Sequence, residues 1–249
     1  MINHVKYKLM NDQFPQNSIT LSGVLEHQVA SVDSVIFLKV AAESSAKLLL
    51  HDDQPMQEQK SITYHIVLEK NAKLIFLLAI LQAQNLDLTI YLYLEDDGAQ
   101  AELFGLYGLD GQQQCSIKTY QMHYGVGTQS SVVLKGMLKD QVQASVQGLI
   151  FIDHNARKTN ASQENKNIVM GNQARVISVP SIEVLQHDVN CCHGTAVGQF
   201  DEQHRWYLQS RGFTMDQVSV MLIHSFFGDV VEKFDDQAHY LEMLCKKMI

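Results

Sequence analysis

Residues 86–95 read LDLTIYLYLE, and this stretch decides the fold class. Its apolar members recur at every second position and alternate with polar or amphipathic residues: Leu86, Leu88, Ile90, Leu92 and Leu94. This period is typical of a β-strand that buries one face. Other stretches rich in Val, Ile and Tyr predict further strands at residues 61–68, 131–138, 144–152 and 175–184. The chain from about residue 20 to residue 200 is therefore predicted to be mainly β.

Short polar breaks separate the predicted strands and resemble one another. Each contains Asn, Asp or Gly followed by Ala, at residues 70–72, 97–99, 154–156 and 171–174. These residue types tolerate the left-handed backbone of a tight corner. Ala156 and Ala174, which end the last two breaks, stand 18 residues apart. Such recurrence favours a β-solenoid, and periodicity alone leaves a β-sandwich as the alternative.

The final fifty residues follow a helical period instead. Asp201 can cap a first helix over residues 201–211, and Gly212 can close it. Thr214 and Gln217 fit a capping box that starts a second helix over residues 215–234. A third helix is predicted over residues 237–247. We therefore expect a solenoid core over residues 1–200, with residues 1–20 irregular, and a helical domain over residues 201–249.

Charge and apolar runs exclude several classes of protein. The formal net charge is −8 and the pI is about 5.7, so the basic patch of a nucleic-acid-binding protein is not expected. The longest apolar run, residues 74–81, is much shorter than the roughly 20 residues that span a membrane. No export signal is apparent at the start, and the four cysteines lack a paired spacing. We expect reduced cysteines and a cytoplasmic protein.

Common catalytic motifs are not found in the sequence. It contains no G-x-x-x-x-G-K-[ST] phosphate loop, no H-E-x-x-H, no C-x-x-C and no G-x-S-x-G. We therefore expect no enzyme activity and no ATP binding by a phosphate loop. The acidic pairs at residues 52–53, 96–97 and 235–236 are interpreted as solvated turns.

Residues 188–193 carry the most specific local chemistry. If they form a strand, Cys191 and His193 point to one face and Cys192 to the other. A thiolate beside an imidazole suits iron or zinc, but two ligands do not complete a site. A partner chain or a substrate thiol would supply the others. The alternative is that both cysteines are small packing residues and His193 is an ordinary edge residue.

The same region resembles a known family over a long, ordered set of matches. Residues 188–198, DVNCCHGTAVG, are similar to the SufD motif of the SufB/SufD family, and the resemblance extends over about residues 120–235. The other stretches that carry it are residues 128–136, 154–170, 180–184 and 207–212. Two positions depart from the family pattern. His187 stands where an aspartate pair would begin, and Cys192 replaces a serine.

The resemblance implies both a fold and a function. The fold would be a right-handed parallel β-helix with a C-terminal helical domain, and we expect the chain to lack the family's usual N-terminal helical region. The function would be that of a SufD-like scaffold subunit of the SUF iron–sulfur cluster assembly complex. A transient iron–sulfur cluster would form on the complex, with none bound tightly by the isolated chain.

The resemblance also implies partners and contact residues. A SufB-like subunit, or a second copy of the chain, would bind through the β-helix, where His193 and Cys191 are candidate ligands of the nascent cluster. A SufC-like ATPase would dock on the C-terminal helices, for which the candidate residues are Phe226, Phe227, Val230, Phe234 and Arg211. Core packing is the alternative for most of the apolar residues on these helices, and an exposed remainder would mark the docking face. Nucleic acid and membrane are not expected partners.

Two other functions stay open from the sequence. One is a structural β-helix that associates with itself and handles no metal. The other is a β-helical enzyme that acts on polysaccharide. It ranks last because no cluster of acids and aromatics recurs at two-residue spacing.

Overall fold

The computed structural model of the chain describes residues 19–21, 23–28, 34–52 and 56–249. In these ranges the chain forms fourteen strands followed by three helices. The strands are β1 (Ile19–Leu21), β2 (Gly23–Gln28), β3 (Ser34–Val40), β4 (Ser45–His51), β5 (Met56–Leu68), β6 (Lys73–Ile80), β7 (Ala83–Leu94), β8 (Gln100–Leu109), β9 (Gln114–His123), β10 (Gln129–Leu138), β11 (Gln143–Ile152), β12 (Thr159–Val169), β13 (Arg175–Val184) and β14 (Val189–Gly198). The helices are α1 (Glu202–Ser210), α2 (Met215–Val231) and α3 (Gln237–Met248).

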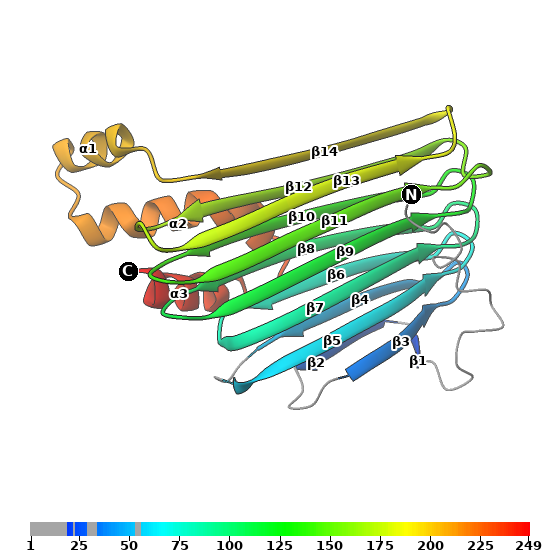
Figure 1. The fold of residues 1–249 in the computed structure, drawn as a ribbon, viewed down its shortest axis with the longest axis horizontal. Coiled ribbons are helices and arrows are strands. Elements are labelled where there is room, and N and C mark those ends of the chain that lie inside the picture. Colours follow the sequence, from blue (N-terminus) through cyan, green and yellow to red (C-terminus); the bar gives the residue numbers. More distant parts are fainter. Residues whose placement is uncertain (1–18, 22, 29–33, 53–55) are drawn as a thin grey trace.

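The strands are arranged in two parallel sheets that face each other (Figure 1). The odd-numbered strands form one sheet, the odd sheet, and the even-numbered strands form the other, the even sheet. Because successive strands alternate between the sheets, the chain winds as a flattened solenoid. The predicted β-solenoid is confirmed. A β-sandwich would instead need antiparallel strands.

The length of one turn differs from the spacing suggested by the sequence. Gln112 and Gln141 are 29 residues apart and join equivalent corners of neighbouring turns. The breaks that end at Ala156 and Ala174 lie at opposite ends of β12, so they are two different corners. The 18-residue spacing is therefore not the length of a turn.

Left-handed residues form the corners, as the breaks predicted. Asn71 (φ 52°), Gly98 (φ 71°) and Gly171 (φ 91°) adopt this backbone. In the corner that contains Asn155, however, the left-handed residue is Lys158 (φ 58°). The N–H of Asn71 donates to the carbonyl of Asp97 at 3.0 Å, so hydrogen bonding continues from one corner to the next.

The alternating apolar residues stack inside the solenoid. Leu88, Ile90 and Leu92 of β7 are fully buried between the sheets. In the parallel register Leu88 lies between Ile62 of β5 and Ile117 of β9, so each turn places apolar side chains on those of the next. Each such side chain contributes roughly 1.5–3 kcal/mol through burial. This interior is the main core.

Two of the helices cover the outer face of the even sheet (Figure 1). Phe227, Val230 and Phe234, from α2 and the turn after it, pack on outward-facing residues such as Leu77 and Phe104. The predicted capping box is confirmed, because Thr214 and Gln217 bond reciprocally at the start of α2. Among the described residues, no helix has the length and apolar composition that crossing a lipid bilayer requires.

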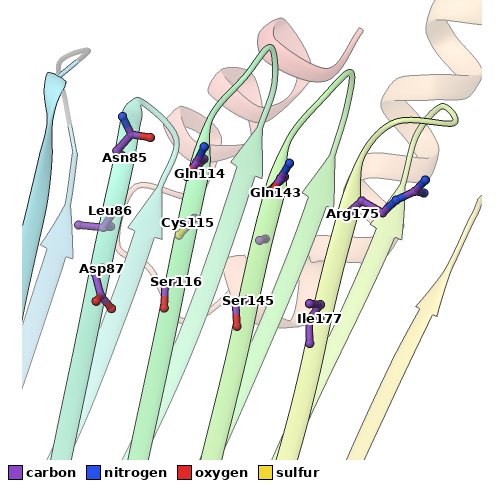
Figure 2. A pocket seen from close by; sticks show the side chains of 11 residues that line it. Asn85, Leu86, Asp87, Gln114, Cys115, Ser116, Gln143, Ser145, Arg175 and Ile177 are labelled. Carbon is purple, nitrogen blue, oxygen red and sulfur yellow. The ribbon is translucent and has the colours of Figure 1, made fainter.

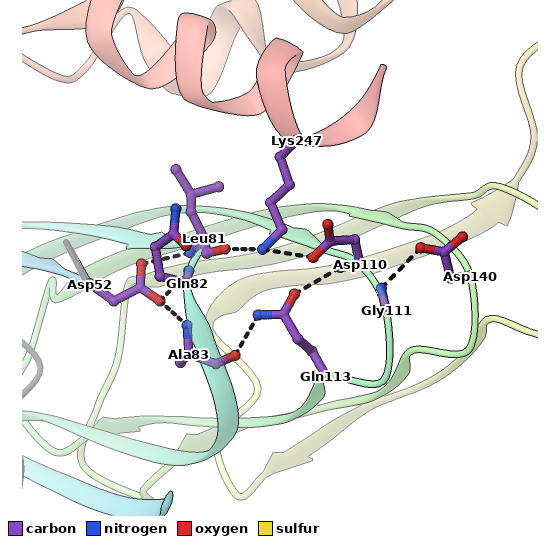
Figure 3. A network of polar contacts seen from close by, with 9 residues as sticks. All are labelled: Asp52, Leu81, Gln82, Ala83, Asp110, Gly111, Gln113, Asp140 and Lys247. Carbon is purple, nitrogen blue, oxygen red and sulfur yellow. Dashed lines mark hydrogen bonds and ion pairs between the residues drawn. The ribbon is translucent and has the colours of Figure 1, made fainter. Parts of the chain in front are cut away.

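A lysine fastens the end of α3 to a corner of the solenoid that a buried carboxylate holds in place (Figure 3). Asp52 accepts hydrogen bonds from the backbone N–H groups of residues 81–83, at 2.6–2.7 Å. Lys247 of α3 donates to the carbonyl of Leu81 and pairs with Asp110 at 3.1 Å. Burial raises the pKa of Asp52, while the three N–H groups and Lys247 oppose that shift. The prediction that residues 52–53 form a solvated turn is thus wrong for Asp52, which is buried as a hydrogen-bond acceptor.

The predicted boundaries agree with the structure to within a few residues. Strands 61–68, 131–138 and 144–152 lie inside longer strands, and residues 175–184 form β13. The second helix ends at Val231 and not at residue 234. The expectation that residues 1–20 are irregular lies mostly outside the described residues, although Ile19 and Thr20 belong to β1. The division into two domains at residue 200 stays a prediction.

Candidate functional site

The last turn of the solenoid leaves two strand edges open. In the described ranges β13 pairs only with β11, and β14 pairs only with β12 (Figure 1). The other edge of each strand therefore presents N–H and C=O groups that no described strand pairs. Residues of β14 are mostly exposed for the same reason.

The side chains of β14 alternate between the interior and the outside. Cys191 packs against an interior cluster that includes Ile150 and Ala161. Thr195 bonds across the interior to Ser178 of β13, with 2.8 Å between the two hydroxyl oxygens. His193, midway between Cys191 and Thr195, faces the interior by alternation. Cys192 is exposed on the outward face. Residues 189–193 do form a strand, as predicted, and Cys191 faces the interior. The role of Cys191 and His193 as metal ligands stays a prediction.

Polar side chains form the floor beneath this open end. Tyr107 donates to Asn167 and lies 3.3 Å from Asn165 Oδ1. Asn165 donates to the hydroxyl of Ser178 at 2.8 Å, and Ser178 in turn contacts Thr195. Burial raises the pKa of Tyr107, so its hydroxyl stays protonated. The chain thus places a connected set of neutral polar groups under the last strand.

A buried histidine, which the sequence reasoning missed, lies deeper in the same interior. His123 at the end of β9 is fully buried, and its ring nitrogens lie 2.8 Å from the hydroxyls of Thr128 and Ser130. Burial lowers the pKa of His123 to about 3, so the ring is neutral at physiological pH. The inward positions Thr119, Gln121 and His123 of β9 are all polar, and this run could have indicated a polar interior.

The two remaining cysteines are packing residues. Cys115 belongs to the main core, and burial raises the pKa of its thiol to about 12. Cys245 lies against the core beneath the helices, and burial raises its pKa as well. A thiol needs a low pKa to act as nucleophile or ligand, so neither is prepared for such chemistry. None of the four cysteines forms a disulfide in this structure.

Metal-binding side chains are sparse elsewhere. In the part of the chain that the structure describes, no three His, Cys, Asp or Glu side chains gather into a group that could hold a metal ion. Cys191 and His193 are therefore two donors from one strand, without a third from the same chain among the described residues.

The C-terminal helices divide into buried and exposed residues. Phe227, Val230 and Phe234 are buried against the even sheet, so they are packing residues in this chain. Phe226 is half-buried, with the Lys135 ammonium 5.3 Å from its ring centroid. Arg211 is exposed and lies over the ring of Tyr207. Of the five predicted contact residues, only Arg211 and the open side of Phe226 are therefore accessible from outside.

Helix α1 presents aromatic residues that the sequence reasoning missed as contact candidates. It has no buried residue, and Trp206 and Tyr207 are 72% and 57% exposed. Figure 1 shows α1 beyond the end of β14, away from the sheets. Trp206 and Tyr207 stand among the polar residues of the predicted first helix, and this contrast could have been noticed in the sequence.

A groove of about 480 Å³ crosses the outer face of the odd sheet (Figure 2). Asn85, Gln114, Gln143 and Arg175 line it in register near the starts of β7, β9, β11 and β13. Asp87 is the one carboxylate among the lining residues, and it pairs with Lys118 at 3.2 Å. Because cleavage of polysaccharides generally uses two carboxylates, this groove does not support that alternative.

Comparison with known proteins connects this geometry to a family. The sequence matches the family described as SUF system FeS cluster assembly, SufBD core domain, over residues 18–226. The iron–sulfur cluster assembly protein SufD of Escherichia coli is 30% identical over 132 residues, which cover 53% of this chain and 31% of that protein. A SufBD family protein of Mycobacterium leprae is 30% identical over 178 residues, 68% of this chain and 45% of that protein. SufD of Bacillus subtilis is 28% identical over 123 residues, 49% of this chain and 28% of that protein.

The chain spans less than half the length of these curated relatives. The family match nevertheless runs through the whole described solenoid and into α2, so it includes Cys191 and His193. The resemblance inferred from residues 188–198 is confirmed. The chain belongs to the SufB/SufD family of iron–sulfur cluster assembly proteins, and it is SufD-like at about 30% identity.

Proposed function

We propose that the chain is a SufD-like scaffold subunit, with no enzyme activity of its own, which works in complex with a SufB-type partner and a SufC-type ATPase. One observation carries this proposal. Cys191 and His193 face the interior at the open end of the solenoid, on a strand whose second edge is unpaired. Their other ligands can arrive only from outside this strand, which is where a second subunit would bind.

The open strand edges are suited to pairing with a second solenoid. Strands of a partner can bond to the unpaired N–H and C=O groups of β13 and β14, as in β-strand addition. Val184 and Val197 are apolar yet exposed there, and such a partner would bury them. The partner is a SufB-type subunit or a second copy of this chain.

The chemistry at the interface is that of cluster assembly. Imidazole nitrogen and thiolate sulfur are ligands that iron accepts in proteins. The nascent iron–sulfur cluster is the cargo, held in part by His193 and Cys191 and in part by groups of the partner. Since this chain supplies two donors, the isolated subunit would hold no cluster tightly.

The ATPase would dock on the helical segment. Trp206 and Tyr207 on α1, with Arg211 after it, are exposed residue types that often dominate the energy of protein interfaces. These side chains replace the buried Phe227, Val230 and Phe234 as the residues that we expect to touch the partner.

The test uses the complex of this chain with its SufB-type and SufC-type subunits. Ferrous iron and sulfide are added without oxygen, and the cluster is measured by its visible absorption. We expect the His193→Ala complex to form less cluster by at least a factor of about 10–100, because removing a ligand should cost no less than the loss of a hydrogen-bond partner that orients one. Cys191→Ser should have the same effect in weaker form. The matched control is Cys192→Ser, one residue away and outward-facing, which should be silent.

Unfolding of the free His193→Ala chain separates the ligand role from a packing role. Because His193 is exposed, the variant should unfold at nearly the wild-type temperature. Full assembly by the His193→Ala complex would remove this residue from the site. The rival function, self-association without metal, also rests on the unpaired edges of β13 and β14. Filaments of the pure chain, with no ATPase subunit in pull-downs from native extract, would favour it.

A further inference from the structure

One side-chain amide oxygen on the inward face of β12 lacks a hydrogen-bond partner among the described residues. Gln163 is 4% exposed, and its Oε1 atom is shielded from solvent without a donor in the described part of the chain. A buried carbonyl oxygen normally accepts at least one hydrogen bond, so an unpaired one points to a missing partner.

Gly148 on the opposite sheet explains how this amide is held. A Cβ atom at residue 148 would lie 1.7 Å from Gln163 Nε2 and 2.3 Å from its Oε1. The φ angle of Gly148 is not in the left-handed region, so the obstacle to a side chain there is the Gln163 amide and not backbone strain. The side chain of Gln163 therefore extends across the interior into a gap that only glycine leaves.

The residue directly above Gln163 is His193. The parallel register pairs Gln163 with His193, Ala161 with Cys191 and Asn165 with Thr195. Paired residues on adjacent strands lie about 4.8 Å apart and point to the same face. The rows on both sides have their contacts, since Cys191 packs on Ala161 and Thr195 shares Ser178 with Asn165. In the row between them, the unpaired acceptor Gln163 Oε1 lies beside the imidazole ring of His193, which carries an N–H donor.

We propose that Gln163 is a positioning residue for His193. Its Oε1 accepts a hydrogen bond from one ring N–H and fixes the tautomer, so that the lone pair of the other nitrogen is directed toward the open end of the solenoid. Histidines that ligate metals generally donate their second N–H to such an acceptor. The hydrogen bond would form in the free chain. Its effect on cluster assembly rests on the proposed function.

The chain offers a matched control for Gln163. Gln121 is also a buried glutamine of the interior, and its Nε2 is unpaired. It lies on β9, where its Oε1 accepts from Ser130 at 2.6 Å, and it has no register contact with β14. Replacing either glutamine by methionine removes the amide and keeps the length of the side chain.

The experiment is NMR spectroscopy of the full chain labelled with ¹⁵N-histidine, with the His193 signals assigned by their loss in His193→Ala. We expect one dominant tautomer of His193 and a ring N–H that exchanges slowly enough with water to be observed. Gln163→Met should abolish the N–H signal and mix the tautomers, while Gln121→Met should leave both unchanged. Gln163→Glu, which keeps an acceptor, should retain the N–H signal even if the methionine variant folds poorly.

Two results would overturn the proposal. One is a ring N–H of His193 that exchanges freely in the wild-type chain, and the other is a signal that survives in Gln163→Met. Either would mean that His193 does not donate to the oxygen of Gln163. In the assembled complex, Gln163→Met should lower cluster formation by a factor of about 10–100. Normal cluster assembly by the His193→Ala complex would contradict only the proposed ligand role of His193. The hydrogen bond is tested separately, by the spectra of the free chain.

Discussion

Replacing Gly148 by alanine tests how the interior near the candidate site is packed. The new Cβ would lie 1.7 Å from Gln163 Nε2, well inside any real contact distance. Overpacking of this kind costs about 1–3 kcal/mol. The lower chain entropy of alanine in the unfolded state returns about 0.4–1 kcal/mol. The two ranges together give a loss of about 0–2.6 kcal/mol, and we expect Gly148→Ala to lower the free energy of unfolding by about 1–2 kcal/mol, the middle of that range.

A double-mutant cycle identifies the atom that causes this cost. In a Gln163→Ala background the new methyl group meets no amide, so Gly148→Ala should be neutral or stabilising there. The coupling energy should then be about 2 kcal/mol, compared with about 0.3–0.5 kcal/mol for independent sites. The assay is urea-induced unfolding followed by far-UV circular dichroism, with the free energies compared through the transition midpoints.

Gly194→Ala on β14 is the control, because a Cβ at that position would meet nothing within 4 Å and the glycine has no left-handed φ. It should unfold like the wild-type chain. The reasoning is refuted if Gly148→Ala is tolerated as well as Gly194→Ala, or if the two changes in the cycle are additive. Either result would mean that Gln163 does not occupy the gap above Gly148.

Three further predictions follow from contacts in other parts of the fold. Burial lowers the pKa of His123 to about 3, so below about pH 6.5 the unfolded chain binds a proton that the folded chain does not. The free energy of unfolding should therefore fall by roughly 1.4 kcal/mol per pH unit between about pH 6 and pH 4, and less steeply in His123→Gln. Urea unfolding at several pH values measures both slopes. Lys247→Met should speed amide hydrogen exchange in α3, because it removes the contacts to Leu81 and Asp110. Lys246→Met, at the exposed neighbouring position, should not, and equal exchange in both variants would argue against the fastening role of Lys247. Phe227→Ala should destabilise the chain by about 3–5 kcal/mol, because Phe227 is buried. Trp206→Ala should leave thermal unfolding unchanged and weaken binding to the ATPase subunit in a pull-down, because Trp206 is exposed. The opposite pattern would mean that α1 packs and α2 docks.

The features that sequence determined here are those set by local chemistry. Leu88, Ile90 and Leu92 alternate with polar residues, and only an extended strand buries such a set on one face. Thr214 and Gln217 define the start of α2 because both capping hydrogen bonds form within one helical turn. The orientations of Cys191, Cys192 and His193 follow from the same period of two.

Tertiary structure decided whatever depends on residues that are distant in the chain. Phe227 and Trp206 are both large apolar residues on C-terminal helices, but only Phe227 meets the outward face of the even sheet, so one is buried and the other exposed. Gly148 is needed because Gln163 reaches it from the opposite sheet, and Gln163 lies under His193 because 30-odd residues close a turn between them. The sequence specified the strand and the side on which each residue lies. Which residues share a row depends on the number of residues in each turn, and the corners set this number through contacts between turns that no local pattern records.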